Sequence, residues 1–191
     1  MSSMASLGGD DDIGPDYPRR RRELASRLAE LPGPPTGFLI TRQPNVRYFT
    51  GFVGSNAVAL VDREGRAVLG TDARYASVAA RVQESDETVE VVLERATLAA
   101  CAEAGARRGH VLLAVEGSFT VGEAAVISAA SMRTVTDNGV LAQIRSSKDP
   151  GERATIARAC AITSQALEAV LGEIVPPDSE LIGILDVPFH C

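Results

Sequence analysis

The sequence has no tryptophan, and its aromatic residues make up only 4% of 191 residues. Stacking platforms for nucleic-acid bases or sugars need several exposed aromatic rings, so this composition disfavours those binding classes. The charge points the same way, because 19 Lys and Arg stand against 25 Asp and Glu and give a formal net charge of −6. We therefore expect neither nucleic acid nor an anionic membrane surface as a partner.

Cysteine and histidine are also scarce. The three cysteines, Cys101, Cys160 and Cys191, form no CxxC pair, so the sequence predicts neither a disulfide framework nor a zinc knuckle. His110 and His190 are the only histidines, and neither has a second histidine or a carboxylate cluster at ligand spacing. Chemistry that depends on several histidines is excluded, and the cysteine usage suits a reducing compartment.

Long apolar runs are missing as well. No segment approaches the roughly 20 apolar residues that a membrane-spanning helix requires. The basic run 19–22 leads into residues 23–31, which are too charged for the apolar centre of a signal peptide. We therefore predict a cytoplasmic protein.

The remaining sequence divides into three parts. Residues 1–17 are small and acidic and have little to bury, so we predict a disordered tail. Residues 18–147 alternate short apolar runs with helical patterns, which predicts an α/β domain. Residues 148–191 begin with Asp149 as a helix N-cap and Pro150 in the first turn, so we predict a long linker helix to about Ile174.

Local patterns predict the elements of the middle part. Pro18 opens an amphipathic helix that ends at 32–33, and we expect its basic run 19–22 to form a solvated face. Residues 37–41 predict a buried strand, and 42–45 predict its exit turn. Further expected elements are strands 57–62, 66–70, 88–93, 111–115 and 133–136, and helices 73–82, 96–107 and 120–130.

One turn determines the kind of sheet. Glu64 and Gly65 lie between two apolar runs and predict a β-hairpin. A hairpin makes the sheet mixed, so the predicted fold class is α/β with a mixed β-sheet flanked by helices. Thr120, followed three residues later by Glu123, is a capping box that opens one of the predicted helices.

Two common catalytic motifs are absent. Gly54-Ser55-Asn56 lacks the frame of a nucleophile elbow. The segment 51–54 has two glycines but lacks the third glycine and the Gly-Lys-Ser/Thr ending of a phosphate-binding loop. We interpret these glycines as parts of a tight turn.

Three segments together carry a resemblance to a known family. They are 45–56 (NVRYFTGFVGSN), 59–62 (ALVD) and 71–75 (TDARY). Their order and spacing resemble the N-terminal, creatinase-like domain of Xaa-Pro aminopeptidases and prolidases, the pita-bread metallopeptidases. The resemblance covers about residues 18–180 and implies a creatinase N-terminal-like fold, followed by a linker helix and a truncated start of the pita-bread domain.

The resemblance also implies where the hydrolase chemistry belongs. In this family two Asp, one His and two Glu of the C-terminal pita-bread domain hold a pair of divalent metals, commonly manganese, that activate a hydroxide. The acidic residues after position 150 match no part of that ligand set. We therefore assign no catalytic residue, metal ligand or cofactor to this chain and expect it to be inactive alone.

For the N-terminal domain itself, the resemblance implies roles in dimer assembly and in restricting the active-site entrance. The exposed candidates for substrate gating are Tyr48, Arg74 and Tyr75, because an arginine near an entrance can bind a substrate carboxylate in a bidentate contact. A structural alternative exists: Asp72 and Arg74 cap the next helix and pair with a neighbour, while Tyr48 and Phe49 fill the core.

Two functional hypotheses remain open. The first is an N-terminal assembly and gating domain of an Xaa-Pro aminopeptidase-like metallopeptidase, which acts on peptide substrate only when a catalytic domain is supplied. The second is a stand-alone binding or regulatory module that pairs with a full-length paralogue. Either way, we expect a homo-oligomer or a complex with the paralogue.

Overall fold

The computed structural model describes residues 15–31, 33–137 and 139–174. These residues belong to two compact units, one formed by residues 15–147 and one beginning at Lys148. Most of the predicted disordered tail, together with His190 and Cys191, lies outside the described residues.

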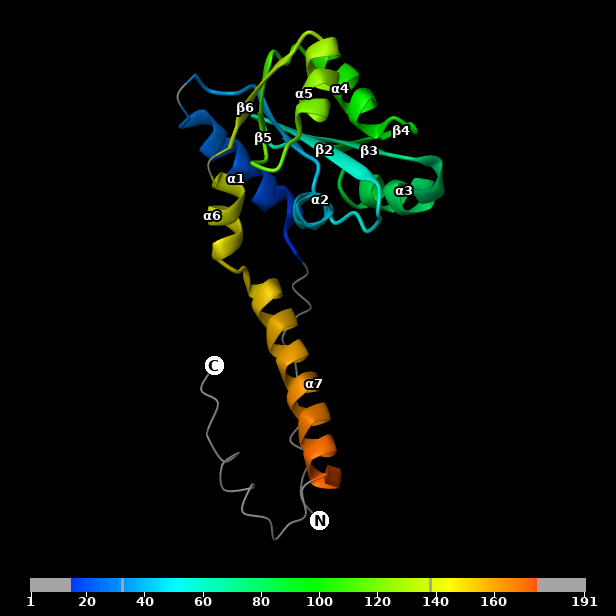
Figure 1. The fold of residues 1–191 in the computed structure, drawn as a ribbon, viewed down its shortest axis with the longest axis vertical. Helices are drawn as coiled ribbons and strands as arrows, with labels where there is room; N and C mark the ends of the chain where they lie inside the picture. Colours follow the sequence, from blue (N-terminus) through cyan, green and yellow to red (C-terminus); the bar gives the residue numbers. More distant parts are fainter. Residues whose placement is uncertain (1–14, 32, 138, 175–191) are drawn as a thin grey trace. The chain divides into compact units, whose positions relative to one another are not determined.

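A six-stranded mixed sheet forms the middle of the first unit (Figure 1). Its order is β4-β3-β2-β1-β5-β6. The strands are β1 (Gly37–Ile40), β2 (Ala57–Asp62), β3 (Ala67–Thr71), β4 (Val89–Leu93), β5 (Leu112–Val115) and β6 (Arg133–Thr136). Strand β2 is antiparallel to both its neighbours, whereas all other neighbouring pairs are parallel. The predicted mixed α/β fold is confirmed.

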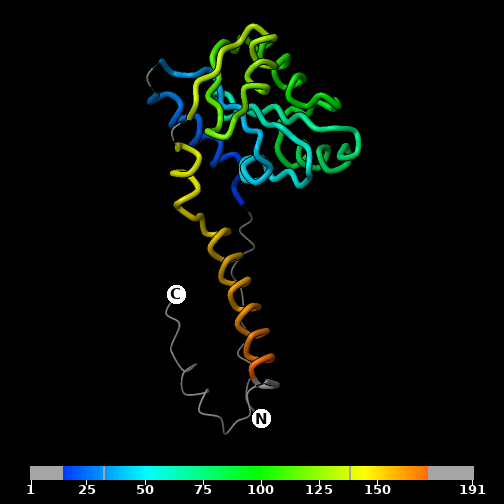
Figure 2. The backbone as a smooth tube through the Cα atoms, in the orientation of Figure 1, coloured from blue at the N-terminus to red at the C-terminus, as the bar shows by residue number. Residues whose placement is uncertain are grey.

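Helices cover both faces of this sheet (Figures 1 and 2). The helices are α1 (Tyr17–Ala29), α2 (Gln43–Thr50), α3 (Ala76–Ser85), α4 (Thr97–Arg107), α5 (Val121–Ala129) and α6 (Val140–Ser146), with a 3₁₀ turn η1 (Ala73–Tyr75) before α3. One apolar core includes side chains from α1, α2, α3 and α6, and a second core on the opposite face includes side chains from α4 and α5.

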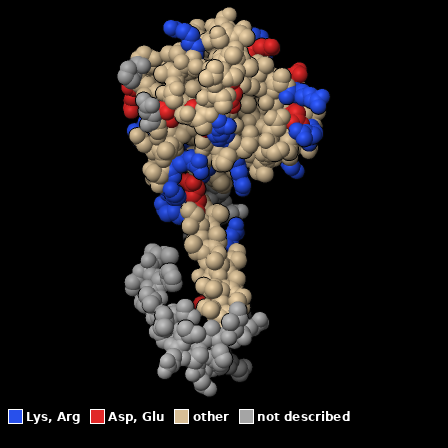
Figure 3. Space-filling view, viewed as in Figure 1, with Lys and Arg blue, Asp and Glu red and all other residues tan. Residues whose placement is uncertain are grey.

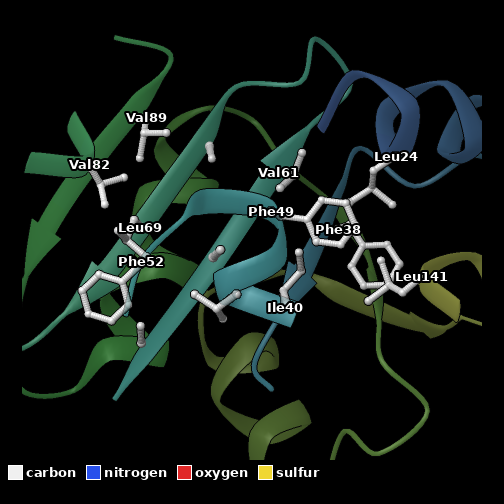
Figure 4. Packing of buried hydrophobic residues seen from close by; sticks show 14 of the residues in the cluster. Leu24, Phe38, Ile40, Phe49, Phe52, Val61, Leu69, Val82, Val89 and Leu141 are labelled. Atoms are coloured by element: carbon white, nitrogen blue, oxygen red, sulfur yellow. The ribbon is translucent and has the colours of Figure 1, made fainter. Parts of the chain in front are cut away.

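The central strands are mainly apolar because both of their faces are covered, and the polar residues Asp62 and Thr71 stand at strand ends. In β2, Ala59 and Val61 belong to the first core, while Val58 and Leu60 belong to the second. Figure 4 shows how the first core is assembled from distant segments, with Leu24, Phe38, Phe49 and Leu141 close together. This packing holds α1, β1, α2 and α6 against one another.

The structure confirms the two local signals. The antiparallel pairing of β2 with β3 joins Ala57 to Thr71, and Gly65 in the turn has a φ of 78°, a backbone conformation that favours glycine. At the start of α5, the Thr120 hydroxyl accepts from the Glu123 backbone N–H at 3.2 Å. The Thr120 N–H donates to the Glu123 carboxylate at 2.6 Å, which completes the capping box.

The expected turn over 42–45 is wrong, because helix α2 begins there at Gln43. Pro44 stands in the first turn, where its missing N–H costs no intrahelical hydrogen bond. Val46 and Phe49 bury their side chains in the core, and Gly51 ends the helix with a φ of 74°. The same polar residues occur in turns and at helix starts, and here the burial of the side chains that follow them favours the helix. Helix α6 had no counterpart among the predicted elements.

The expected solvated face of the basic run is also wrong in part. Arg19 and Arg22 are exposed, but Arg20 and Arg21 are buried. The Arg21 side chain donates to the carbonyls of Gly65 at 3.0 Å and Phe49 at 2.8 Å. Its Nη2 also donates to Asp86 at 2.5 Å and to Thr88 at 2.8 Å. A buried charge is tolerated when its donors are paired in this way.

The second unit contains helix α7 (Pro150–Ile174), as predicted. The Glu152 N–H donates to the Asp149 carboxylate at 2.8 Å, and the Asp149 N–H donates to the Glu152 carboxylate at 3.1 Å. This reciprocal arrangement satisfies donors at the helix start. The face of α7 visible in Figure 3 is mainly uncharged. The exposed large apolar side chains of α7 are Ile156, Ile162, Leu167 and Val170.

Within the described part of the chain, no helix combines the length and the apolar character needed to cross a bilayer. On the face of residues 15–147 shown in Figure 3, basic and acidic side chains lie next to one another. That face therefore offers no broad surface of a single charge.

Candidate functional site

Polar side chains gather at one edge of the sheet. The carboxyl ends of β1, β3, β4 and β5 lie there, and the antiparallel strand β2 begins there. Ligands of open α/β sheets bind outside the carboxyl ends of the strands. Hydrogen-bonded polar residues at this edge include Thr41, Asn45, Asn56, Asp72, Arg74, Tyr75 and Glu116.

A carboxylate of the chain links the carboxyl ends of β1 and β5. Glu116 directly follows β5 and is buried. Its Oε2 accepts hydrogen bonds from the backbone N–H groups of Thr41 at 2.7 Å and Arg42 at 2.9 Å. Its Oε1 accepts from Asn45 Nδ2 at 2.5 Å, and Asn45 in turn accepts from Arg145 Nη1 at 2.5 Å. These contacts tie β5 to α2 and α6, and both oxygens of the carboxylate accept hydrogen bonds within the chain.

A second carboxylate organises the end of β3. Asp72 Oδ1 accepts from the backbone N–H of Arg74 at 3.0 Å and from its Nε at 2.9 Å. Asp72 Oδ2 accepts from Arg74 Nη2 at 2.8 Å and from Asn56 Nδ2 at 2.7 Å. The hydrogen bonds from Arg74 and Asn56 hold the pKa of Asp72 far below its usual range. The carboxylate is therefore charged at any physiological pH.

The side chain of Arg74 is exposed, but part of its guanidinium is already hydrogen-bonded. Its side chain is 73% exposed, but Asp72 occupies the bidentate edge formed by Nε and Nη2. The hydrogen bond to Asp72 raises the pKa of Arg74. A substrate carboxylate that approached Arg74 would meet the Nη1–Nη2 end of the guanidinium, whose remaining N–H groups are not used by Asp72. These are the contacts of the structural alternative, with Asp72 capping η1 and pairing with Arg74.

Tyr75 lies in the same cluster. Its hydroxyl is 2.7 Å from Ser55 Oγ and accepts from the Ser55 backbone N–H at 3.2 Å. These hydrogen bonds from Ser55 lower the pKa of Tyr75. The ring stands edge-on to Phe52, with 5.7 Å between centroids, and the Arg74 guanidinium carbon lies 5.7 Å from the Tyr75 centroid. The loop after α2 and the turn η1 therefore support each other.

Tyr48 belongs to a different cluster, on α2. The guanidinium carbon of Arg20 lies 4.0 Å from its ring centroid, and that of Arg145 lies 5.6 Å away. The ring is half-buried and edge-on to Phe49, which is fully buried. The structure thus brings Arg74 and Tyr75 together and places Tyr48 with the arginines of α1 and α6.

Sequence reasoning missed a groove next to Arg74. It has a volume of about 740 Å³. It is lined by Asn56, Asp72, Ala73, Arg74, Leu93, Glu94 and Arg95. The last three residues end β4 and follow it, and no motif marks them. Only the parallel pairing of β3 with β4 brings them beside Asp72 and Arg74.

The described residues offer no metal centre, because no group of three His, Cys, Asp or Glu side chains among them is arranged to hold an ion. Cys101 is fully buried, and this burial raises the pKa of its thiol to about 12. A thiol that stays protonated at neutral pH is a poor nucleophile. Its place in the second core indicates a packing role.

Comparison with known proteins places the chain in a family. Residues 21–147 match the model of the creatinase/prolidase N-terminal domain, so the chain belongs to this family. The crystal structure of the N-terminal domain of the cytoplasmic peptidase PepQ from Mycobacterium tuberculosis is 30% identical and matches with a TM-score of 0.58. The match covers 66% of this chain and 98% of that domain. The resemblance inferred from the sequence is confirmed.

Two further solved structures share the fold. The Xaa-Pro dipeptidase from Bacillus anthracis is 23% identical, with a TM-score of 0.72 over 87% of this chain and 46% of its own. The N-terminal domain of a putative metallopeptidase from Corynebacterium diphtheriae is 24% identical, with a TM-score of 0.51 over 63% of this chain and 97% of its own. No curated protein sequence matches the chain. The chain thus spans about half of the dipeptidase and is homologous to isolated N-terminal domains of peptidases.

Proposed function

We propose that residues 15–147 are the N-terminal assembly and substrate-gating domain of an Xaa-Pro aminopeptidase-like metallopeptidase. The family match over residues 21–147 carries this proposal. According to this proposal, a catalytic domain outside the described residues removes N-terminal residues that precede proline, and this chain by itself is inactive. Since the M. tuberculosis relative is described as a cytoplasmic peptidase, we propose the same compartment for this protein.

The cluster around η1 supports a gating role. Arg74 and Tyr75 are held by Asp72 and Ser55, so their positions do not depend on a ligand. Preorganised groups contact a substrate at a lower entropic cost than mobile ones. Val53, two residues before Ser55 in the chain, exposes 57% of its surface and is an apolar group of the same loop. This surface has the mixed character needed to contact a short peptide at an entrance.

The proposal assigns the metal ions to the catalytic domain. The family resemblance implies two divalent ions, commonly manganese, that would supply a metal-activated hydroxide there. The part of this chain that the structure describes contributes contacts and assembly only. Purified chain incubated with Mn²⁺ and an Xaa-Pro peptide is expected to give no turnover, and turnover that follows the chain through purification would contradict this.

Gating itself is tested in a chimera in which residues 15–147 replace the N-terminal domain of the B. anthracis dipeptidase. A group that contacts substrate equally before and during reaction changes KM and leaves kcat nearly unchanged. We expect this pattern for Arg74→Gln and Tyr75→Phe, with Arg133→Gln as an exposed control on β6. Identical KM values in all four proteins would refute the gating role of these residues.

The second candidate is a stand-alone module that pairs with a full-length paralogue or with a second copy. The exposed apolar side chains of α7 favour it, because clusters of such residues mark interaction surfaces. Light scattering at tens of micromolar is expected to show an oligomer, or co-purification to recover the paralogue. A monomer that retains no peptidase partner would exclude this candidate.

A further inference from the structure

Strand β6 forms one edge of the sheet (Figure 1) and pairs with β5 on one side only. The N–H groups of Arg133 and Asp137 donate to carbonyls of the segment 111–115. Successive residues of a strand direct their backbone groups to opposite sides, so the N–H and C=O groups of Thr134 and Thr136 point away from β5. No hydrogen bond joins these groups to another described residue.

This edge is accessible and consists of strong strand formers. Val135 is 42% exposed, and Thr136 is also exposed. Val135 lines a groove of about 500 Å³ together with Leu31 of the segment after α1 and Val140 of α6. Threonine and valine favour strands, and an unpaired strand edge is a template on which a further strand can pair. The edge of β6 therefore has the properties of an interaction surface.

The sequence of the edge is complementary to itself when two copies run antiparallel. The outward backbone groups of two such strands are all paired when Thr134 lies opposite Thr136 of the second copy. This register gives four N–H···O=C bonds, because each of its two Thr pairs exchanges two. In the same register Val135 lies opposite Val135 of the second copy, and Arg133 lies opposite Asp137.

The charges favour this register over its neighbours. The Arg133 side chain is exposed and has no hydrogen bond or ion pair with another described residue. Asp137 accepts from the Val140 N–H at 2.9 Å, but a carboxylate has about four acceptor sites and can also accept from a guanidinium. Residues directly opposite each other on one face have Cβ atoms about 4.5–5.5 Å apart, which an arginine side chain easily spans. A shift by two residues in either direction would place Val135 opposite a charged residue.

We propose that β6 pairs antiparallel with β6 of a second copy of this chain, so that one sheet runs through both copies. Two-fold symmetry closes this contact and forms the ion pair between Arg133 and Asp137 twice. The contact is small, so we expect a Kd of about 0.1–1 mM. The inference gives the assembly role proposed above its contact surface and rests on that role, whereas the gating residues take no part in it.

The backbone contact is tested by sedimentation equilibrium of the full chain up to about 2 mM. Thr136→Pro removes an outward N–H and places its ring where the second strand must approach, while the N–H groups that bond to β5 stay in place. Proline is tolerated on edge strands in this position. We expect Thr136→Pro to weaken dimerisation at least about tenfold, because it removes two of the four hydrogen bonds. The control Thr136→Val keeps the backbone N–H and should leave the Kd within about twofold.

The charge contact is tested in the same assay. Arg133→Asp replaces both ion pairs with pairs of like charge and should weaken dimerisation about tenfold. Arg133→Lys keeps the charge and should stay within about twofold of wild type. Arg81→Asp makes the same charge change at an exposed position of α3 and should leave the Kd unchanged.

The register is tested by crosslinking in a background with Cys160→Ser and Cys191→Ser. Oxidised glutathione converts two facing thiols to a disulfide and is itself reduced. Val135→Cys should give a disulfide-linked dimer, because the two positions 135 lie directly opposite each other. Val53→Cys, an equally exposed position in the loop after α2, should crosslink at least about tenfold more slowly, and adding Thr136→Pro should slow the Val135→Cys reaction to a similar extent.

Two results overturn the proposal: a Kd that Thr136→Pro leaves unchanged, or crosslinking at 135 that is no faster than at 53. If the chain still dimerises, the assembly role stands on another surface, whereas a monomer up to about 2 mM removes that role as well. The gating test is separate. The KM values of the chimera are measured at nanomolar enzyme, far below this Kd, so Arg133→Gln remains a suitable control there.

Discussion

Replacing Arg21 with methionine is expected to destabilise the domain strongly. Methionine preserves the aliphatic part of the side chain but leaves the carbonyls of Gly65 and Phe49 and the carboxylate of Asp86 without their donor. An unsatisfied buried acceptor costs about 1–3 kcal/mol, and breaking a buried ion pair costs about 3–5 kcal/mol. These costs overlap, and the Asp86 side chain is 11% exposed and regains some water. We expect a loss of about 3–4 kcal/mol.

Urea unfolding of the full chain measures this loss. With an m-value of about 2 kcal/mol/M, the midpoint should fall by roughly 1.5–2 M. Arg19→Met is the matched control, because Arg19 belongs to the same helix and run but is exposed. Its effect should stay within about 0.5 kcal/mol. A change below about 1 kcal/mol for Arg21→Met would refute the assignment of this arginine as a buried tie between segments.

The pH dependence supplies a second readout. Burial acts to raise the pKa of Asp86, but hydrogen bonds from Thr88 and Arg21 outweigh it, so the pKa of Asp86 in the folded chain lies below its ordinary value of 3.8. A carboxyl with a lowered pKa stabilises the fold above its unfolded value and loses this contribution as the pH falls through the folded value. The difference in the free energy of unfolding between wild type and Arg21→Met should therefore become smaller below about pH 3.8.

Three further predictions concern stability. Burial lowers the pKa of His110, so the unfolded chain binds a proton at this residue more readily than the folded chain does. The Tm should therefore fall as the pH drops below 6.5, and His110→Gln should make the Tm less dependent on pH in this range. In Gly70→Ala the new Cβ would lie 2.6 Å from Cys101 Sγ, so calorimetry should show a loss of about 1–3 kcal/mol that Cys101→Ala partly restores. Glu116→Ala leaves the Thr41 and Arg42 N–H groups unpaired and should cost about 2–4 kcal/mol by urea unfolding.

Elements with local signals could be predicted from the sequence. The turn at Gly65 and the capping box at Thr120 each depend on residues within a few positions of one another. Helix α2 could not be predicted in this way, because its first residues suit a turn as well as a helix start. Its burial of Phe49 against β1 and α1 resolves that ambiguity.

The candidate site shows the same limit. Arg74 and Tyr75 could be singled out because they belong to a recognisable segment, and the structure places them in one cluster. The sequence left open whether Arg74 gates a substrate or whether Asp72 and Arg74 cap the next helix and pair with a neighbour, and only the structure shows Asp72 hydrogen-bonded to Nε and Nη2 of Arg74. The residues that follow β4 escaped notice for a related reason, since Arg95 joins the groove only through the pairing of β3 with β4.

By itself, the sequence determined the alternation of strands and helices and the mixed character of the sheet, because apolar periodicity and short turn motifs encode these locally. The family was indicated by the resemblance of three of its segments to known proteins. Tertiary structure alone decided what each charged side chain does. Arg19 and Arg21 are two positions apart in one basic run, yet one is solvated and the other is buried among partners from 28 to 67 residues away. A charge can be buried only where such partners converge, and the chain's path in space determines where that happens.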